Sequence, residues 1–325
     1  MTVCISVSPF FTAANKSNFA DFVDIYIILY NNFNTYYLNA LFNDLYMIRI
    51  RVFSDFCTST ECKKQFERTN VSSSVSSYNK KYYITDQDDY THVILLNKAM
   101  PTLTVSKENV IGLACEPREF LYVTHEFVDY AKKHVRQYFI GNAVGLPSPF
   151  VEGFGYLWHV NPGREIVQKT KCMSIILSSK TCAPGHKYRH DFVSRIIQLG
   201  LPIDIYGRGS SQYSSPRIMG SFVETEPYEN YMFTICIENF QNNHYVSEKV
   251  MTPLMFNCTP IYWGCPNIHH YFDGIIGLSG QLDGDIEIVQ NILTNPTNHH
   301  VKTYTDKNRK TANLLENLDT LFPSM

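Results

Sequence analysis

FTICIENFQNNHYVSEKVMTPLMFNCTPIYWGCP, residues 233–266, is the stretch that decides the fold, because apolar runs alternate in it with polar segments. Phe233–Ile237 is short, apolar and rich in aromatic and β-branched residues, which predicts a buried strand. Ser247 is a candidate N-cap for a helix that we expect to end near Asn257. Thr259–Trp263 then predicts a second strand. Strand, helix and strand form a βαβ unit, which places the loop after the first strand at the carboxyl edge of a parallel sheet, where open α/β sheets bind ligands.

The loop and the first helical turn of this unit carry side chains that suit a sugar joined to a diphosphate. They are Glu238, Asn239, Tyr245, Glu248 and Lys249. Carboxylates and amides hydrogen-bond sugar hydroxyls, and a cation beside a helix N-terminus neutralises phosphate charge. On composition alone, the same residues also suit a solvated loop that leads into an ordinary amphipathic helix.

Three groups of residues in this stretch resemble, in order and in spacing, the signature block of the α-1,3/α-1,4-fucosyltransferases, glycosyltransferase family 10. They are Glu238-Asn239, Tyr245-Val246-Ser247-Glu248-Lys249 and Pro260-Ile261-Tyr262-Trp263-Gly264-Cys265-Pro266. The family's block reads roughly F-E-N-S, then Y-V-T-E-K, then P-I-Y-W-G-x-P. Phe240 replaces the usual serine, and Ser247 replaces a threonine but keeps the hydroxyl. The resemblance covers roughly Met173–Phe272, less than a third of the chain.

The resemblance implies an α/β fold in which two Rossmann-like domains face each other across a cleft, the glycosyltransferase-B (GT-B) arrangement. We expect an acceptor-side domain at 1–160, a donor-binding domain at 161–300 and a helical tail at 301–325. The interdomain linker is expected between the Gly- and Pro-rich stretch 141–155 and about Lys169. The alternation of strand-like and helix-like segments along the chain is compatible with this fold.

Hydrophobic periodicity and polar breaks predict the remaining elements. The expected strands are Tyr46–Phe53, His92–Leu96, Val110–Cys115, Cys172–Leu177, Ile203–Tyr206 and Ile275–Leu278, of which the second and third would be parallel neighbours. The expected helices are Thr58–Arg68, His125–Tyr138, Arg189–Leu199 and Ile286–Leu293. Val71–Tyr78 is typical of a serine-rich loop, and the polar tail has an apolar seam at Leu314, Leu315, Leu318 and Leu321.

Glu116 is the candidate general base. It follows the run Val110–Cys115, and Pro117 disfavours a helical backbone at Glu116. The resemblance implies a base glutamate after a strand in the middle of the first domain, and Glu116 matches that position best. Glu119 and Glu126 are weaker candidates, and a loop carboxylate without a chemical task is the alternative.

Arg189 is the candidate diphosphate-binding arginine, expected at the start of the helix after the loop Ser178–Tyr188. The resemblance implies an arginine here, and a planar guanidinium can bind phosphate oxygens through two hydrogen bonds. Arg195 lies in the same helix and could be mistaken for it. Alternatively, Arg189 only covers the sheet with its aliphatic stem.

The reaction implied by the resemblance is an inverting transfer of fucose from GDP-fucose to a hydroxyl of an acceptor glycan. Glu116 would take the proton of the attacking hydroxyl. The residues implied for donor binding are Arg189, Asn239, Tyr245, Glu248 and Lys249. A related transferase that uses another nucleotide sugar, and a non-catalytic nucleotide- or carbohydrate-binding protein, are the alternatives. A retaining transferase is disfavoured, because Glu238 and Glu248 are ten residues apart and that class often has two glutamates eight apart.

Two Asp-x-Asp strings, Asp86-Gln87-Asp88 and Asp283-Gly284-Asp285, have the pattern with which transferases of another fold hold a divalent cation. Both strings lie in polar segments, and Arg189 and Lys249 can offset the charge of a diphosphate. We therefore expect no metal and no other cofactor.

Composition and charge exclude several classes of protein. The net charge of −2 gives no electrostatic reason to bind nucleic acid or an anionic membrane. The nine cysteines are odd in number and several lie in apolar runs, which indicates buried intracellular thiols rather than a disulfide framework. Neither a signal peptide nor an apolar run of about 18 residues is present, so we expect a soluble, cytoplasmic protein without a membrane anchor.

Overall fold

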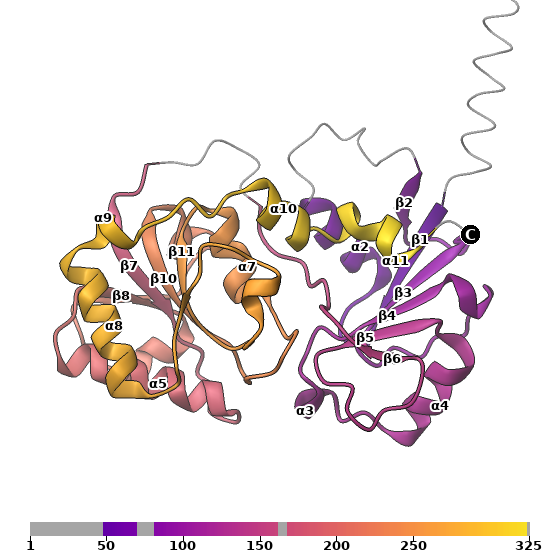
Figure 1. The fold of residues 1–325 in the computed structure, drawn as a ribbon, viewed down its shortest axis with the longest axis horizontal. Helices are drawn as coiled ribbons and strands as arrows, with labels where there is room; N and C mark the ends of the chain where they lie inside the picture. The colour runs from indigo at the N-terminus through magenta and orange to yellow at the C-terminus, as the bar shows by residue number, and fades with distance from the viewer. Residues whose placement is uncertain (1–47, 70–80, 162–167, 324–325) are drawn as a thin grey trace, which may run out of the picture. The chain divides into compact units, whose positions relative to one another are not determined.

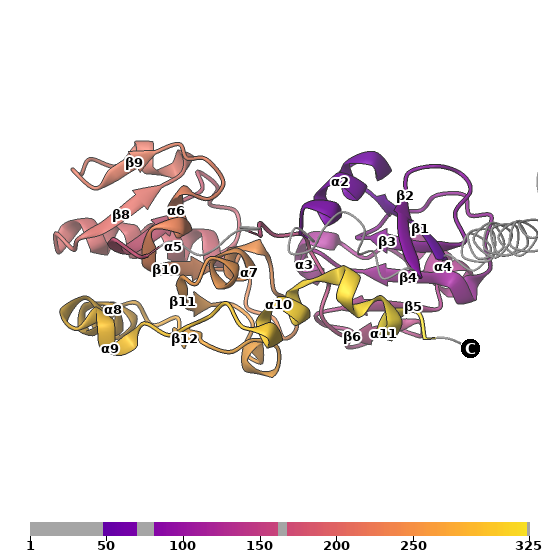
Figure 2. The same ribbon diagram turned by 90° about the horizontal axis from the view of Figure 1, so that it is seen from above.

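The computed structural model describes residues 48–69, 81–161 and 168–323. They form two six-stranded sheets, with the strand orders β2-β1-β3-β4-β5-β6 and β12-β11-β10-β7-β8-β9 (Figure 1, Figure 2). The strand pairings of both sheets are parallel. Parallel neighbours need crossover connections, and several of these contain helices here as in other α/β proteins. The predicted α/β class with two Rossmann-like domains is confirmed.

The first sheet is built from residues before 153. Its strands are β1 (Ile48–Ser54), β2 (Tyr82–Thr85), β3 (His92–Leu96), β4 (Val110–Leu113), β5 (Gln137–Ile140) and β6 (Phe150–Glu152), and its helices are α2 (Ser59–Thr69), α3 (Arg118–Leu121) and α4 (His125–His134). All four residues of β4 are buried, because apolar side chains cover both faces of the sheet. The predicted helix in α2 and the predicted parallel pairing of β3 with β4 are confirmed.

The helix predicted over His125–Tyr138 is too long. It begins at the predicted residue, where Thr124 accepts a hydrogen bond from the N–H of Phe127, but it ends at His134. Gln137–Ile140 instead alternates between half-buried and buried residues and pairs with β4 as a strand. Apolar residues on both sides of the helix end made the two elements look continuous in the sequence.

The strand predicted over Val110–Cys115 ends at Leu113. The N–H of Cys115 donates to the side-chain oxygen of Asn97 at 2.9 Å, so the chain leaves the sheet before Glu116. A further strand, β6, lies inside the Gly- and Pro-rich stretch 141–155 and completes the first sheet, so only the residues after it are left for a linker.

The second sheet is built from residues 171–277. Its strands are β7 (Lys171–Ile176), β8 (Ile203–Tyr206), β9 (Ile218–Gly220), β10 (Tyr231–Ile237), β11 (Thr259–Trp263) and β12 (Ile276–Gly277), and its helices include α5 (Pro184–Gln198), α6 (Glu226–Glu229), α7 (Glu248–Met255), α8 (Leu282–Thr294) and α9 (Pro296–His299). In Figure 1, α5 and α8 lie side by side over this sheet, and a buried aliphatic cluster joins them to it.

The predicted βαβ unit is present as β10, α7 and β11. β10 pairs with β11 in parallel, with Phe233 opposite Thr259 and Ile237 opposite Trp263. Ser247 is the N-cap, and its side chain accepts a hydrogen bond from the N–H of Lys249. The contrast between buried strands and the polar loop therefore located this unit correctly.

The helix predicted to begin at Arg189 begins five residues earlier. Pro184 is its first residue, a position at which the missing N–H of proline has no cost. Instead of a Ser, Thr or Asp cap, Nδ1 of His186 accepts the N–H of Ala183 at 3.2 Å. Arg189 consequently lies in the second turn of α5, and the prediction that it starts the helix is wrong.

The polar tail forms α10 (Asp306–Ala312), a short 3₁₀ segment (Leu314–Asn317) and α11 (Leu318–Leu321). Three of the four predicted seam leucines are buried in the core of the first sheet, where Phe322 joins them, and Leu315 is partly buried against it. A hydrogen bond from Tyr82 to Asp319 at 2.6 Å also ties α11 to β2. Residues 314–322 thus pack on the first sheet, whereas α10 contacts α7 beside the second sheet.

Some predictions fall on residues outside the described ranges, namely the N-terminal segment and the loop Val71–Tyr78. The eight described cysteines are free thiols, of which Cys182 is exposed although it was expected to be buried. Among the described residues, no helix has the length and hydropathy of a membrane span.

Candidate functional site

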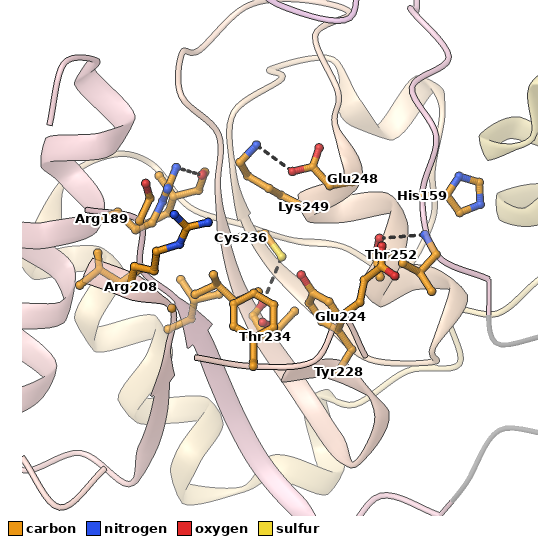
Figure 3. Close-up of a pocket in the computed structure, with 18 of the residues that line it drawn as sticks. His159, Arg189, Arg208, Glu224, Tyr228, Thr234, Cys236, Glu248, Lys249 and Thr252 are labelled. Carbon is orange, nitrogen blue, oxygen red and sulfur yellow. Dashed lines mark hydrogen bonds and ion pairs between the residues drawn. The ribbon is translucent and has the colours of Figure 1, made fainter. Parts of the chain in front are cut away.

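A cavity of about 770 Å³ lies at the carboxyl edge of the second sheet (Figure 3). The ends of β7 and β10, the turn after β8 and the first turns of α7 form much of its wall. Five cationic side chains and two carboxylates line it: Arg68, Lys180, Arg189, Arg208 and Lys249, with Glu224 and Glu248. This excess of positive charge at the edge where parallel sheets bind ligands suits a diphosphate.

The loop between β10 and α7, residues 238–247, is called the signature loop below. Beneath the cavity, Glu238 holds this loop together. It directly follows β10, and its side chain is fully buried. Its carboxylate accepts the N–H of Ser247 at 2.9 Å and the hydroxyl of Ser247 at 2.8 Å, and it lies 3.2 Å from Nζ of Lys249. A buried carboxylate with this many partners fixes the loop against the start of α7. Glu238 therefore organises the site from below rather than facing a ligand.

Lys249 and Glu248 are the residues of the signature block that reach the cavity from α7. Nζ of Lys249 lies 3.3 Å from Oε1 of Glu248, as the dashed line in Figure 3 marks. Burial acts to lower the pKa of Lys249, but the charges of Glu238 and Glu248 outweigh it and raise the pKa above that of an ordinary lysine. Lys249 is therefore charged at neutral pH, and 26% of its side chain is exposed.

Burial acts to raise the pKa of Glu248. It favours the neutral acid, but the positive charge of Lys249 and hydrogen bonds outweigh it, so the pKa of Glu248 lies below the usual value. Its side chain is about half exposed, at 47%. An ionised, accessible carboxylate beside a cation can accept hydrogen bonds from sugar hydroxyls while the cation contacts phosphate.

Arg189 lies in the cavity wall and is buried, with one guanidinium nitrogen 2.6 Å from the carbonyl oxygen of Ile237. Burial lowers its pKa and the charge of Glu238 opposes that shift, but an arginine stays protonated in either case. The helix that carries it approaches the end of β10 closely at Gly185, where a Cβ would lie 1.7 Å from the carbonyl oxygen of Glu238. Glycine at that position allows α5 to present Arg189 to the cavity.

Asn239 and Tyr245, the other two predicted donor-binding residues, do not line the cavity. The side-chain oxygen of Asn239 lies 3.3 Å from the same guanidinium nitrogen of Arg189, so Asn239 helps to orient that arginine. Tyr245 is buried under the signature loop with only 5% of its surface exposed. The structure brings Arg189, Glu248 and Lys249 together at the cavity and places these two behind them.

Glu116 follows β4 of the first sheet and is half-buried. Its Oε2 is buried and has no hydrogen-bond partner among the described residues. Burial raises the pKa of Glu116, the positive charge of Lys249 acts to lower it, and Glu248 raises it further. A buried carboxylate oxygen without a partner and with a raised pKa has the properties of a general base.

The two weaker candidates for the base differ from Glu116 in their surroundings. Glu119 is exposed and accepts a hydrogen bond from the side chain of Asn242 at 2.7 Å. Glu126 is exposed in the first turn of α4. Neither has a buried oxygen that lacks a partner, so Glu116 remains the candidate.

Several cavity residues were not found from the sequence, among them Lys180, Arg208 and His159. Lys180 and Arg208 are exposed, and the described residues offer no hydrogen-bond or ion-pair partner to either side chain. His159 is almost fully buried, its Nδ1 lacks a partner within the described ranges, and burial lowers its pKa to about 4, so it is neutral at pH 7. In the sequence, the one signal that could have indicated Lys180 and Arg208 as site residues is their position shortly after a predicted strand.

Both Asp-x-Asp strings are occupied by contacts within the protein. Asp88 pairs with Arg51, and Asp283 lies 2.6 Å from Arg195, so that arginine is engaged away from Arg189. Asp285 is fully buried and accepts hydrogen bonds from the N–H groups of Ser279 and Gly280 at 2.8 Å. Within the described ranges, no group of three acidic, histidine or cysteine side chains has the arrangement of a metal site.

Comparisons with known proteins bear on the second domain. The model of the C-terminal region of glycosyltransferase family 10 (fucosyltransferase) matches residues 166–273. No curated protein sequence matches the chain.

Several solved structures are similar in part. One is an α1,3-fucosyltransferase with GDP, at 14% identity and a TM-score of 0.48, covering 80% of this chain and 82% of that chain. The α1,3-fucosyltransferase with GDP-fucose gives 16% identity and a TM-score of 0.42 over the same shares. An α-glucosyltransferase in complex with UDP and a 13-mer DNA gives 11% identity and a TM-score of 0.44, covering 83% and 95%.

The family match includes the complete signature block, and the structure places two residues of that block, Glu248 and Lys249, in the wall of a cationic cavity. The predicted resemblance to glycosyltransferase family 10, the fucosyltransferases, is thus confirmed over residues 166–273 of the second domain.

Proposed function

We propose that the protein is an inverting fucosyltransferase that moves fucose from GDP-fucose to a hydroxyl of an acceptor glycan. The observation that carries this proposal is the position of Glu248 and Lys249, two residues of the signature block, in the wall of the cavity at the carboxyl edge of β10. The match to the fucosyltransferase family supports fucose as the donor sugar, and the positive charge of the cavity supports a donor that carries a diphosphate.

On the donor side, Lys249 and Arg189 bind the diphosphate and stabilise it as it departs. Arg189 is already oriented by the carbonyl oxygen of Ile237, so little side-chain entropy is lost when the donor binds. Glu248 accepts hydrogen bonds from ribose or sugar hydroxyls. Asn239 and Tyr245 do not contact the donor in this proposal. Asn239 orients Arg189, and Tyr245 fixes the signature loop.

On the acceptor side, Glu116 is the general base. As the acceptor oxygen attacks the anomeric carbon, its proton passes to the Glu116 carboxylate, the bond from carbon to the diphosphate oxygen breaks, and GDP leaves with that electron pair. A single displacement of this kind inverts the anomeric configuration. The raised pKa of Glu116 increases the basicity of its carboxylate.

Two other functions remain to be distinguished, a transferase for another nucleotide sugar and a non-catalytic binding protein. Hydrolysis of a panel of GDP- and UDP-sugars without acceptor, followed by transfer of labelled GDP-fucose to a glycan array, separates them. We expect turnover of GDP-fucose and a product of inverted configuration. Turnover restricted to a UDP-sugar would indicate the other donor class, and binding of GDP without any turnover would indicate a non-catalytic protein.

The proposed mechanism uses no metal, because Arg189 and Lys249 supply the positive charge. Transfer should therefore survive excess chelator. Loss of transfer in chelator that Mn²⁺ or Mg²⁺ restores would show that a cation takes part.

A further inference from the structure

The signature loop between β10 and α7 contacts the segment that carries Glu116. The rings of Phe240 and Phe120 meet edge to face, with centroids 4.8 Å apart and planes at 88°. Two residues further along, the side-chain nitrogen of Asn242 donates to Oε2 of Glu119 at 2.7 Å. We call these two contacts, formed by Phe120, Phe240, Glu119 and Asn242, the clasp.

The same loop approaches two neighbouring strands of the first sheet. Just after β5, a Cβ on Gly141 would lie 2.7 Å from the carbonyl oxygen of Asn243, so only glycine allows this distance. At the end of β6, Oε2 of Glu152 lies 3.7 Å from Nε2 of His244. The loop is therefore held at α3 and at the ends of β5 and β6, and the clasp is the one of these contacts that lies nearest to Glu116 in the sequence.

We propose that Phe240 is a positioning residue that holds α3, and through it Glu116, at the donor site. Phe120 and Phe240 are both half-buried, and α3 is only one turn long, so it has little intrinsic stability of its own. Glu116 lies four residues before Phe120, and Pro117 restricts the backbone between them. This inference rests on the proposed function for its catalytic meaning, although the clasp itself does not.

The clasp explains a departure from the family pattern. Phe240 stands where the signature block usually has a serine, and a serine could not fill the edge of the Phe120 ring. An edge-to-face aromatic pair is favourable beyond the area that it buries, typically by an amount equal to about a two- to tenfold change in an equilibrium. Phe120 and Phe240 thus form a pair in which the loss of either ring removes the contact.

The first test needs no substrate. Amide hydrogen exchange is measured across residues 114–122 in the wild-type chain and in Phe240→Ser. We expect exchange there to become about two- to tenfold faster, while exchange in β10 and β11 stays unchanged. Leu199→Ser is the matched control, since Leu199 is a partly exposed apolar residue at the end of α5, and it should leave residues 114–122 unaffected. Unchanged exchange in Phe240→Ser would overturn the proposal.

The second test separates positioning from binding. Phe240→Ser should lower kcat for transfer by about two- to tenfold without changing the affinity for GDP, and Phe240→Tyr should restore kcat. Phe120→Ala, Phe240→Ala and the double variant should show non-additive losses, because either change alone breaks the pair. Additive losses, or a loss of GDP affinity instead of kcat, would overturn the proposal. Faster exchange in a chain whose wild type transfers no fucose would instead contradict the proposed function and leave the clasp standing.

Discussion

Glu238 and Glu116 both follow a strand at the carboxyl edge of a sheet, but their surroundings differ. Glu238, after β10, is fully buried and its carboxylate is bound by the N–H and hydroxyl of Ser247 and by Lys249. Glu116, after β4, has a buried oxygen without a partner among the described residues. A carboxylate that is fully bound stabilises the site, whereas one that keeps an acceptor open can take a proton. The difference supports a structural role for Glu238 and the proposed role of Glu116 as the general base.

Replacing Glu116 should have the largest effect on turnover and little effect on binding. Glu116→Gln keeps the shape of the side chain but cannot accept a proton, so we expect kcat to fall by about 10²–10⁴. The affinity for GDP, measured by calorimetry, should stay within about twofold, because we propose that Arg189 and Lys249 and not Glu116 hold the donor.

Glu126→Gln is the control for this change, since Glu126 is an exposed carboxylate near Glu116 in the sequence. It should behave as the wild type. Near-normal turnover in Glu116→Gln would remove Glu116 as the base, and Glu119 would then be tested next.

Replacing Glu238 should instead destabilise the fold. Glu238→Ala leaves the N–H of Ser247 without its acceptor and removes one of the two carboxylates beside Lys249. Breaking a buried pair of this kind costs about 3–5 kcal/mol in the free energy of unfolding. Urea denaturation should show this loss, whereas Glu248→Gln, at a half-exposed carboxylate, should leave unfolding nearly unchanged and weaken donor binding. Equal stabilities for both variants would contradict the distinction between them.

Replacing Lys249 should have a smaller effect on donor binding, and it also removes the cation beside the buried carboxylate of Glu238. Lys249→Ala removes a charged hydrogen-bond donor from the cavity, so we expect the binding free energy of GDP to weaken by about 1.5–3 kcal/mol. Arg195→Ala is the comparison, because Arg195 pairs with Asp283 outside the cavity. It should leave GDP affinity unchanged. Unchanged GDP affinity in a folded Lys249→Ala protein would exclude Lys249 from the diphosphate site.

The sequence predicted the βαβ unit well because its signals are local. A polar loop separates two apolar strands, Ser247 caps the helix, and β11 runs from Thr259 to Trp263 as predicted. The start of α5 was missed because its cap is a hydrogen bond to the His186 ring. The usual pattern of a Ser, Thr, Asp or Asn cap does not predict such a bond. β6 was missed because it has only three residues and gains its stability from pairing with β5.

The site was predicted less completely, since burial depends on contacts between distant parts of the chain. Tyr245 and Asn239 look like ligand-binding residues in the sequence, but the fold places them behind Arg189 and under the loop. Lys180 and Arg208 reach the cavity because β7 and β8 are neighbours in the sheet, a pairing that periodicity does not reveal. The clasp likewise joins residues 120 and 240, far apart in the sequence.

The pH dependence of kcat/KM tests the role of Glu116 most directly. Activity should fall as the pH drops through the pKa of Glu116, because the protonated acid cannot accept a proton. Burial raises that pKa against the opposing charges of Lys249 and Lys180, with Glu248 and Glu238 adding to the rise. The wild-type profile should therefore have an acid limb above about 4.3, the ordinary value for glutamate. We predict that this limb disappears from the residual activity of Glu116→Gln, and a limb at the same pH in both enzymes would contradict Glu116 as the base.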